Sequence, residues 1–304
     1  MERRNLLQHF YILLKGMAMG IAELVPGVSG GTIAFVAGIY EEFIGTINNV
    51  NLKTLQVWRE EGFKSFWNAL NGNFLVVLLL GMAISILSFT RLIKWLLENE
   101  PIALWSFFFG LVLASVAVVA KNIKKWTVPV IGLLLVGAIF AYFITSLPPS
   151  TNSASLPYIF FSGALAICAM VLPGISGSFI LVLLGSYKTV IDAIDEKDFK
   201  ILITMALGII FGILSFARLL KWMFDHYKNI TLAILTGFIL GSLNKIWPWK
   251  RILETKTIGK KTIIIDENVS PFAFEGDHQL MYAIIAAIFG FSLIFMLEKT
   301  ASKK

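Results

Sequence analysis

A proline–glycine break recurs inside two apolar stretches of this chain, and it constrains the fold more than any other feature. Residues 20–40 read GIAELVPGVSGGTIAFVAGIY, and residues 166–187 read AICAMVLPGISGSFILVLLGSY. Proline and glycine interrupt a helix and free backbone N–H groups, which membrane proteins tolerate only in protein-buried or cavity-lining segments. We call these stretches the first and the second signature. Two such breaks at matching places in two halves indicate a transporter with its binding site between repeats.

Composition limits the class of protein. The chain is 57% hydrophobic and 15% charged, with a mean hydropathy of +0.78, which is too apolar for a soluble globule. We therefore predict a multi-pass membrane protein. Its net charge of +7 is expected in cytoplasmic loops near anionic headgroups, so nucleic acid is not an expected partner. The single cysteine, Cys168, excludes an intramolecular disulfide and a cysteine metal cluster, and neither metal nor cofactor is expected.

The repeat extends beyond the signatures to the whole half-protein. LSFTRLIKW at 87–95 matches LSFARLLKW at 214–222. Six apolar runs are long enough to cross the hydrocarbon core. The predicted organisation is a first repeat, 1–147, with a hairpin at about 10–47 and spans 74–97, 101–120 and 128–147, and a second repeat, 157–298, with a hairpin at about 158–191 and spans 201–224, 230–244 and 279–297.

The number of crossings in each half sets the relative orientation of the halves. Three spans plus a hairpin, whether re-entrant or crossing twice, give an odd total, so the second half is inverted relative to the first. The predicted fold class is therefore all-α, with two inverted repeats, each of three transmembrane helices and a re-entrant helical hairpin. Loop charges, 14 positive residues inside against 11 outside, favour an N-in, C-in topology. An exterior loop at 245–278 is expected to hold a small β-hairpin turning at Gly259.

Each signature is predicted to restart a helix whose first N–H groups and positive dipole end can bind an anion. Ser29 is suited to cap the first of these helices. The alternative is that each break only kinks a helix and has no binding role. The candidate phosphate-binding residues are Ser29, Gly30, Gly31, Thr32, Ser176, Gly177 and Ser178.

Two repeated arginines, Arg91 and Arg218, are also candidate phosphate-binding residues. Each lies well along a predicted span, where an unpaired arginine facing lipid costs roughly 2.5–3.5 kcal/mol. Inversion would place Arg91 towards the outer face and Arg218 towards the inner face, so that one phosphate could be bound bidentately from either leaflet. The alternative is that both side chains extend to the headgroups, as Lys94 and Lys221 are expected to do.

Glu23 is the carboxylate embedded in the first signature, and Met170 occupies its place in the second. It is a candidate proton-coupling or gating group. The alternatives are a structural ion pair with Lys15 or an arginine, and a hydrogen bond at the helix tip. No residue set suggests catalysis or a metal site.

The signatures together with the LSFxRL segments resemble a bacterial membrane family associated with undecaprenyl-phosphate (polyprenyl-phosphate) translocation. The similarity covers roughly residues 10–300. The resemblance implies a flippase in the bacterial inner membrane that returns undecaprenyl phosphate from the outer to the cytoplasmic leaflet for cell wall biogenesis. The lipid and the membrane are the implied partners, and a homo-oligomer is left open. The family often has Asp where this chain has Glu23.

Two alternative functions belong to other classes of protein. Undecaprenyl-pyrophosphate phosphatases carry Pro-Gly-x-Ser-Arg-Ser and a pair of glutamates, but Gly30 and Gly177 occupy the arginine place here and a second nearby glutamate is missing. A transporter or channel for a small soluble anion would use the same dipole site. We expect a transporter and not an enzyme.

Overall fold

The computed structural model describes residues 4–148, 150, 155–258 and 261–301. Within them the chain is mostly helical, and five helices are long and apolar enough to cross a membrane, or six if the bent pair α10 and α11 counts as one span. The described helices and strands are α1 Leu6–Glu23, α2 Gly30–Val36, α3 Tyr40–Asn48, α4 Leu52–Glu61, α5 Phe63–Leu70, α6 Gly72–Asn99, α7 Pro101–Lys121, α8 Val128–Ser146, α9 Leu156–Val171, α10 Gly177–Leu183, α11 Ser186–Asp195, α12 Phe199–Ser242, η1 Leu243–Ile246, β1 Lys250–Ile258, β2 Lys261–Asn268, η2 Pro271–Ala273 and α13 Leu280–Ala301.

Each signature contains the end of a long helix, a tight turn and a helix of two turns. In the first, α1 leads to the turn and α2 follows it; in the second, α9 and α10 take these places. Gly27 and Gly174 lie in the turns at φ 84° and 91°, a left-handed conformation that glycine adopts without steric cost. The repeated Pro-Gly pair therefore ends one helix and reverses the chain before the next helix begins.

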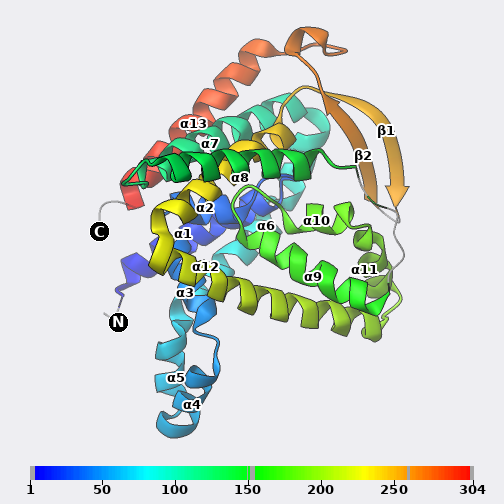
Figure 1. The fold of residues 1–304 in the computed structure, drawn as a ribbon. Coiled ribbons are helices and arrows are strands. Elements are labelled where there is room, and N and C mark those ends of the chain that lie inside the picture. Colours follow the sequence, from blue (N-terminus) through cyan, green and yellow to red (C-terminus); the bar gives the residue numbers. More distant parts are fainter. Residues whose placement is uncertain (1–3, 149, 151–154, 259–260, 302–304) are drawn as a thin grey trace.

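The long helix α12 contains two of the predicted spans, 201–224 and 230–244. At about 1.5 Å per residue it is roughly twice as long as the hydrocarbon core is thick. The helix breaks at Tyr227, where φ −134° and ψ 45° leave the helical region. Figure 1 shows the chain turning back at this break. We call the parts before and after Tyr227 the first and the second arm of α12.

Close glycine contacts hold the helices together in four pairs. In the α1–α6 pair, a Cβ added at Gly16 or Gly81 would collide with the backbone of the facing helix. A Cβ added at Gly163 or Gly208 would collide in the same way between α9 and the first arm of α12. The same pattern joins α7 to α13 and α8 to the second arm of α12. Small residues at such contacts let backbones approach closely, which is how membrane helices associate.

Contact positions give the relative direction of the paired helices. Along α1 and α6, Gly16 faces Leu78 and Gly20 faces Met82, so the two helices run parallel. Parallel contacts also join α9 to the first arm of α12, through Phe160 with Gly208 and Ala164 with Gly212. They join α8 to the second arm of α12, through Leu134 with Gly237 and Ala138 with Gly241. The pairs α1–α6 and α9–α12 are thus built alike in the two halves.

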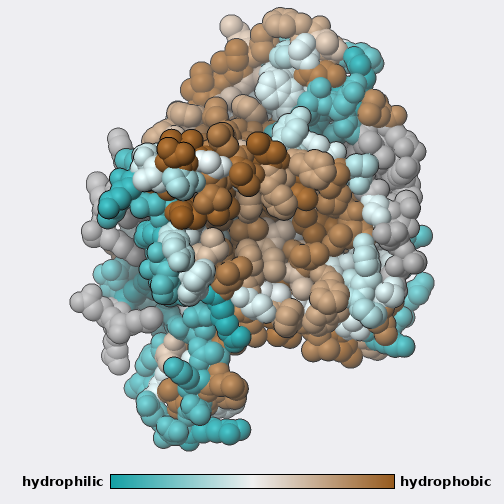
Figure 2. Space-filling view, viewed as in Figure 1, coloured by the Kyte–Doolittle hydropathy of each residue, from teal (hydrophilic) through white to brown (hydrophobic). Residues whose placement is uncertain are grey.

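Polar segments lie at the edges of this apolar bundle. Helices α4 and α5 project from one end in Figure 1, where α3 joins them to the bundle, and strands β1 and β2 form an antiparallel pair at another. The pairing agrees with the predicted hairpin, whereas its expected turn residue, Gly259, lies outside the described residues. Figure 2 shows hydrophobic side chains over the middle of this face and hydrophilic ones around α3–α5.

Candidate functional site

The two signatures contact each other directly in the core of the protein. Ser29 is 1% exposed and Tyr40 is 2% exposed, so their hydroxyl groups must find partners within the protein. Hydrogen bonds cross between the signatures from Ser29 Oγ to Leu172 O at 3.1 Å, from Tyr40 OH to Val171 O at 3.2 Å and from Gly174 N to Thr32 Oγ1 at 3.0 Å. The two signatures therefore meet inside the protein.

The first backbone N–H groups of α2 already donate hydrogen bonds to oxygen atoms of the protein itself. Gly30 N donates to Glu23 Oε1 at 2.8 Å, and Gly31 N donates to Ser29 Oγ at 3.1 Å, so the predicted Ser29 cap is present. Thr32 N donates to Ser29 O at 3.0 Å. The expectation of unpaired N–H groups is therefore wrong for this helix, because Glu23 and Ser29 accept their hydrogen bonds.

Lys15 and Glu23 stabilise opposite ends of α2 instead of pairing with each other. Lys15 Nζ donates to Ala37 O at 2.7 Å, just past the last residue of the helix. Glu23 lies at the first residue, where the positive end of the helix dipole favours a carboxylate. Of the alternatives considered for Glu23, the structure shows the hydrogen bond at the helix tip.

Gly31 lies close to the backbone of the second signature. A Cβ there would be 2.7 Å from Val171 O, a backbone atom that cannot rotate away. The equivalent residue in the second signature is Ser178, which is exposed. The first signature therefore requires a glycine at a position where the second accepts a side chain.

The second signature is more open than the first. Every residue of α2 is buried, whereas among the seven described residues of α10 only Gly177 is buried. Ser176 Oγ and Ser178 Oγ lie 3.0 Å apart, and Ser176 does not cap its helix. Met170 replaces Glu23, so no carboxylate in the described residues accepts from Gly177 as Glu23 does from Gly30.

Arg91 and Arg218 lie on exposed helix surface. Neither forms an ion pair or a hydrogen bond with another described residue. Arg91 is about 12 Å from the end of α6 and Arg218 about 13 Å from the break in α12, at a rise of 1.5 Å per residue. No hydrogen bond or ion pair joins either arginine to the described residues of the signatures.

One lysine that the repeat does not predict contacts both signatures. Lys245, in η1, packs its Cγ near Gly27, where an added Cβ would be 2.9 Å away, and its Nζ lies 5.3 Å from the ring centroid of Phe179 in α10. Asp266 Oδ1 is 3.9 Å from Lys245 Nζ. In the sequence, Lys245 stands out only as one positive charge of the exterior loop at 245–278.

Lys250, at the start of β1, completes this group. Its Nζ donates to Lys245 O at 2.8 Å, lies 3.4 Å from Asp266 Oδ2 and sits over the ring of Trp105. Burial disfavours the charged amine and lowers the pKa of Lys250 to about 8, although the carboxylate of Asp266 acts in the opposite direction. Asp266 is therefore shared by two amines, one of which binds its proton weakly.

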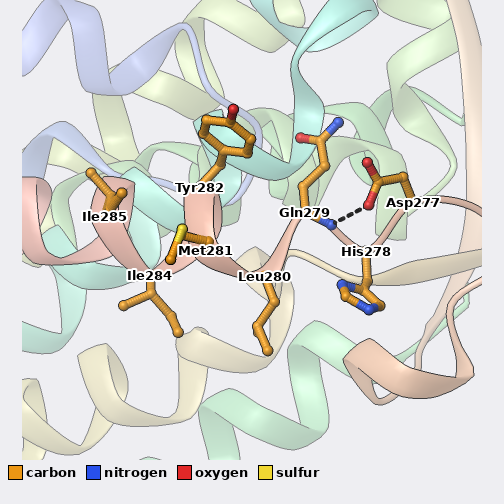
Figure 3. Close-up of a pocket in the computed structure, with 8 residues that line it drawn as sticks. All are labelled: Asp277, His278, Gln279, Leu280, Met281, Tyr282, Ile284 and Ile285. Atoms are coloured by element: carbon orange, nitrogen blue, oxygen red, sulfur yellow. Dashed lines mark hydrogen bonds between the residues drawn. The ribbon is translucent and has the colours of Figure 1, made fainter.

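A shallow hollow at the start of α13 is separate from the signatures. Figure 3 shows its lining, residues 277–282 with Ile284 and Ile285, which includes the hydrogen bond from Gln279 N to Asp277 Oδ1 at 3.0 Å. The hollow is mainly apolar and contains none of the predicted site residues. Among the described residues, no group of three or more His, Cys, Asp or Glu side chains could hold a metal ion.

Comparison with known proteins places the chain in a family. Residues 19–263 match the family described as VCA0040-like, undecaprenyl phosphate translocase-like. The chain belongs to this family. A protein of Vibrio cholerae serotype O1, named polyprenyl-phosphate transporter, is 43% identical over 95% of this chain and 96% of its own length. A Staphylococcus aureus protein of the same name is 34% identical over 78% of this chain and 85% of its own length. No solved structure gives a significant match.

Proposed function

We propose that this protein transports undecaprenyl phosphate or a similar polyprenyl phosphate across the bacterial inner membrane, from the outer to the cytoplasmic leaflet. The observation that carries this proposal is the 43% identity, over nearly the full length of both chains, to a protein named polyprenyl-phosphate transporter. The phosphate passes through a polar path along the signatures, while the long apolar tail stays in the bilayer. This division desolvates only the headgroup.

We propose that the two halves are inverted repeats with re-entrant signature hairpins. The directions of the helices support this arrangement. Helix α1 is parallel to α6, α8 is parallel to the second arm of α12, and α9 is parallel to the first arm. If the chain reverses between α6 and α7, between α7 and α8, and at Tyr227, then α1 and α9 run in opposite directions. We propose an N-in, C-in topology, which the loop charges support.

The phosphate is proposed to bind first at the second signature, near Ser176, Gly177 and Ser178. The exposure of Ser178 and the absence of a Glu23 equivalent support this choice. At the first signature, residues Ser29 to Thr32 are buried, and Glu23 occupies the start of α2. Glu23 is therefore proposed as the gate, because it must leave Gly30 before a phosphate can take its place.

Arg91 and Arg218 are proposed to pair with the lipid phosphate as it enters and leaves. Their exposed positions support this role, because an arginine on the lipid-facing surface at this depth is costly without an anionic partner. Guanidinium groups bind phosphate bidentately, which favours arginine over lysine for this task. The two arginines occupy matching places in the repeats and would serve opposite leaflets.

Ion pairs on α3 support a state closed on the side where α3 lies. Arg4 Nη2 is 2.6 Å from Glu42 Oε1, and Lys228 Nζ, next to the break in α12, is 2.6 Å from Glu41 Oε1. These pairs hold the N-terminal segment and the α12 turn against α3. In an alternating-access cycle they would separate when this side opens.

Transport of a fluorescent polyprenyl phosphate in proteoliposomes tests the proposal. We expect Arg91→Ala and Arg218→Ala each to slow transport by about tenfold or more, the loss expected for a charge-assisted hydrogen bond. Lys94→Ala and Lys221→Ala are matched controls, because these lysines lie on the same helices, with side chains 74% and 42% exposed, and pair with Glu98 and Asp225. Near-normal transport by both arginine variants would remove the arginines from the mechanism.

The same preparation separates the alternative functions. Release of inorganic phosphate from undecaprenyl pyrophosphate would favour a phosphatase. Uptake of inorganic phosphate without lipid transport would favour a small-anion transporter. We expect neither activity.

A further inference from the structure

We propose that Lys245 binds the phosphate group of the transported lipid between the two signatures, and that Asp266 takes the place of that phosphate when the site is empty. This inference rests on the proposed function. It adds a binding residue and a competing carboxylate that neither the repeat nor the family resemblance indicates.

The position of Lys245 is the first argument. Its side chain packs on the Gly27 turn of the first signature, and its ammonium group faces the ring of Phe179, next to Ser178 in the second. The side chain is 27% exposed, so the amine is accessible but partly shielded from water. An anion held by Ser178 would therefore lie near a cation in a region of lowered dielectric, where the attraction is stronger than in bulk water.

The incomplete pairing of Lys245 is the second argument. Its Nζ is 3.9 Å from Asp266 Oδ1, which is longer than a charge-assisted hydrogen bond of about 2.7–2.9 Å. The other oxygen of Asp266 faces Lys250, which also donates to the backbone carbonyl of Lys245. Lys250 thus fixes both the carboxylate and the backbone that carries Lys245, and leaves the ammonium of Lys245 free to exchange Asp266 for a second anion.

The β-hairpin supplies this carboxylate from outside the repeat. Asp266 lies on β2, where its backbone pairs with Ile252 of β1, and Asn268 Nδ2 donates to Asn244 O at 2.8 Å next to Lys245. The hairpin is therefore joined to η1 by two side chains, Asn268 on β2 and Lys250 on β1. A phosphate that displaces Asp266 from Lys245 would still leave Asp266 paired with Lys250, so the carboxylate would not become an unpaired charge.

Equilibrium binding of geranylgeranyl phosphate to the full-length protein in nanodiscs tests the inference. We expect Lys245→Gln to weaken binding about tenfold or more, Lys245→Arg to retain most of the affinity, and Asp266→Asn to bind more tightly than the native protein. Arg251→Gln is the control, because Arg251 is an exposed cation of the same hairpin, paired with Glu267 and Glu275. Two further ligands serve as controls. Geranylgeraniol measures binding of the tail alone, and inorganic phosphate measures binding of the free anion.

The outcomes distinguish this inference from the proposed function. If the native protein binds and transports the lipid phosphate and Lys245→Gln behaves identically, the role of Lys245 is wrong while the function stands. If Asp266→Asn weakens binding as much as Lys245→Gln, the pair is only structural. If the native protein binds no lipid phosphate, both fail. Should Lys245→Gln not fold, the tighter binding expected of Asp266→Asn still decides the question.

Discussion

The first and second signatures share a sequence pattern but differ in what their helix starts contact. At the first, Glu23 and Ser29 accept the N–H groups of Gly30 and Gly31, and the whole of α2 is buried. At the second, Met170 replaces the glutamate and Ser178 is exposed. Two copies of one motif can thus form a closed site and an open site in the same molecule. An exchange of these two environments would constitute the transport cycle.

The largest effect is expected where the signatures touch. Gly31→Ser gives the first signature the residue that the second has at this position, but its Cβ would meet Val171 O. We expect overpacking to cost about 1–3 kcal/mol and to lower the melting temperature in detergent. Ser178→Gly is the reciprocal control and should change the unfolding free energy by less than about 1 kcal/mol. If the two substitutions lowered the unfolding free energy equally, the two signatures would not differ in packing at this position.

A smaller effect on folding, but a clear one on transport, is expected at Glu23. Glu23→Gln keeps an oxygen that can accept from Gly30 N, so folding should change by no more than about 1 kcal/mol. Because the amide cannot gain or lose a proton, the pH dependence of transport should become flatter if Glu23 is the coupling group. The measurement is the transport rate in proteoliposomes across a pH series. A profile that matches that of the native protein would leave Glu23 with a structural role only.

The smallest effect concerns Lys250, which contacts Lys245 and Asp266. Its pKa is about 8 in the folded protein, against an ordinary value of 10.5. Between these pH values the unfolded chain holds a proton that the folded chain has released, so this group makes the unfolding free energy rise with pH. Below pH 8 both states are protonated and its contribution is constant. Lys250→Met should flatten the rise in melting temperature between pH 8 and pH 10, and an unchanged slope would contradict the assignment.

Long apolar runs and the internal repeat made much of this fold predictable. The runs at 74–97, 101–120 and 128–147 coincide with α6, α7 and α8, because about twenty apolar residues without a break have few alternatives to a helix. The segment 225–229 was expected to separate two spans. It stays helical apart from Tyr227, because it contains neither Gly nor Pro to end the helix.

The site was less predictable than the fold. The two matching Pro-Gly breaks indicated a site between the halves. The hydrogen bonds at the start of α2 could not be predicted, because they depend on the side chain of Glu23 folding back onto Gly30, which no spacing rule fixes. Tyr40 recurs as Tyr187, and that recurrence was an unused signal for its hydrogen bond to Val171. Lys245 does not recur in the first half, where the equivalent residue is Val118. The internal repeat therefore does not identify Lys245 as a candidate binding residue.

The glycine contacts have a consequence for how the protein is made. Two of the four close helix pairs, α7 with α13 and α8 with the second arm of α12, join helices from different halves of the chain. The ribosome delivers α7 and α8 to the bilayer well before their partners exist. Their glycine faces must therefore remain covered by lipid or by an insertion chaperone until the C-terminal helices arrive, and assembly is completed only after synthesis is nearly finished.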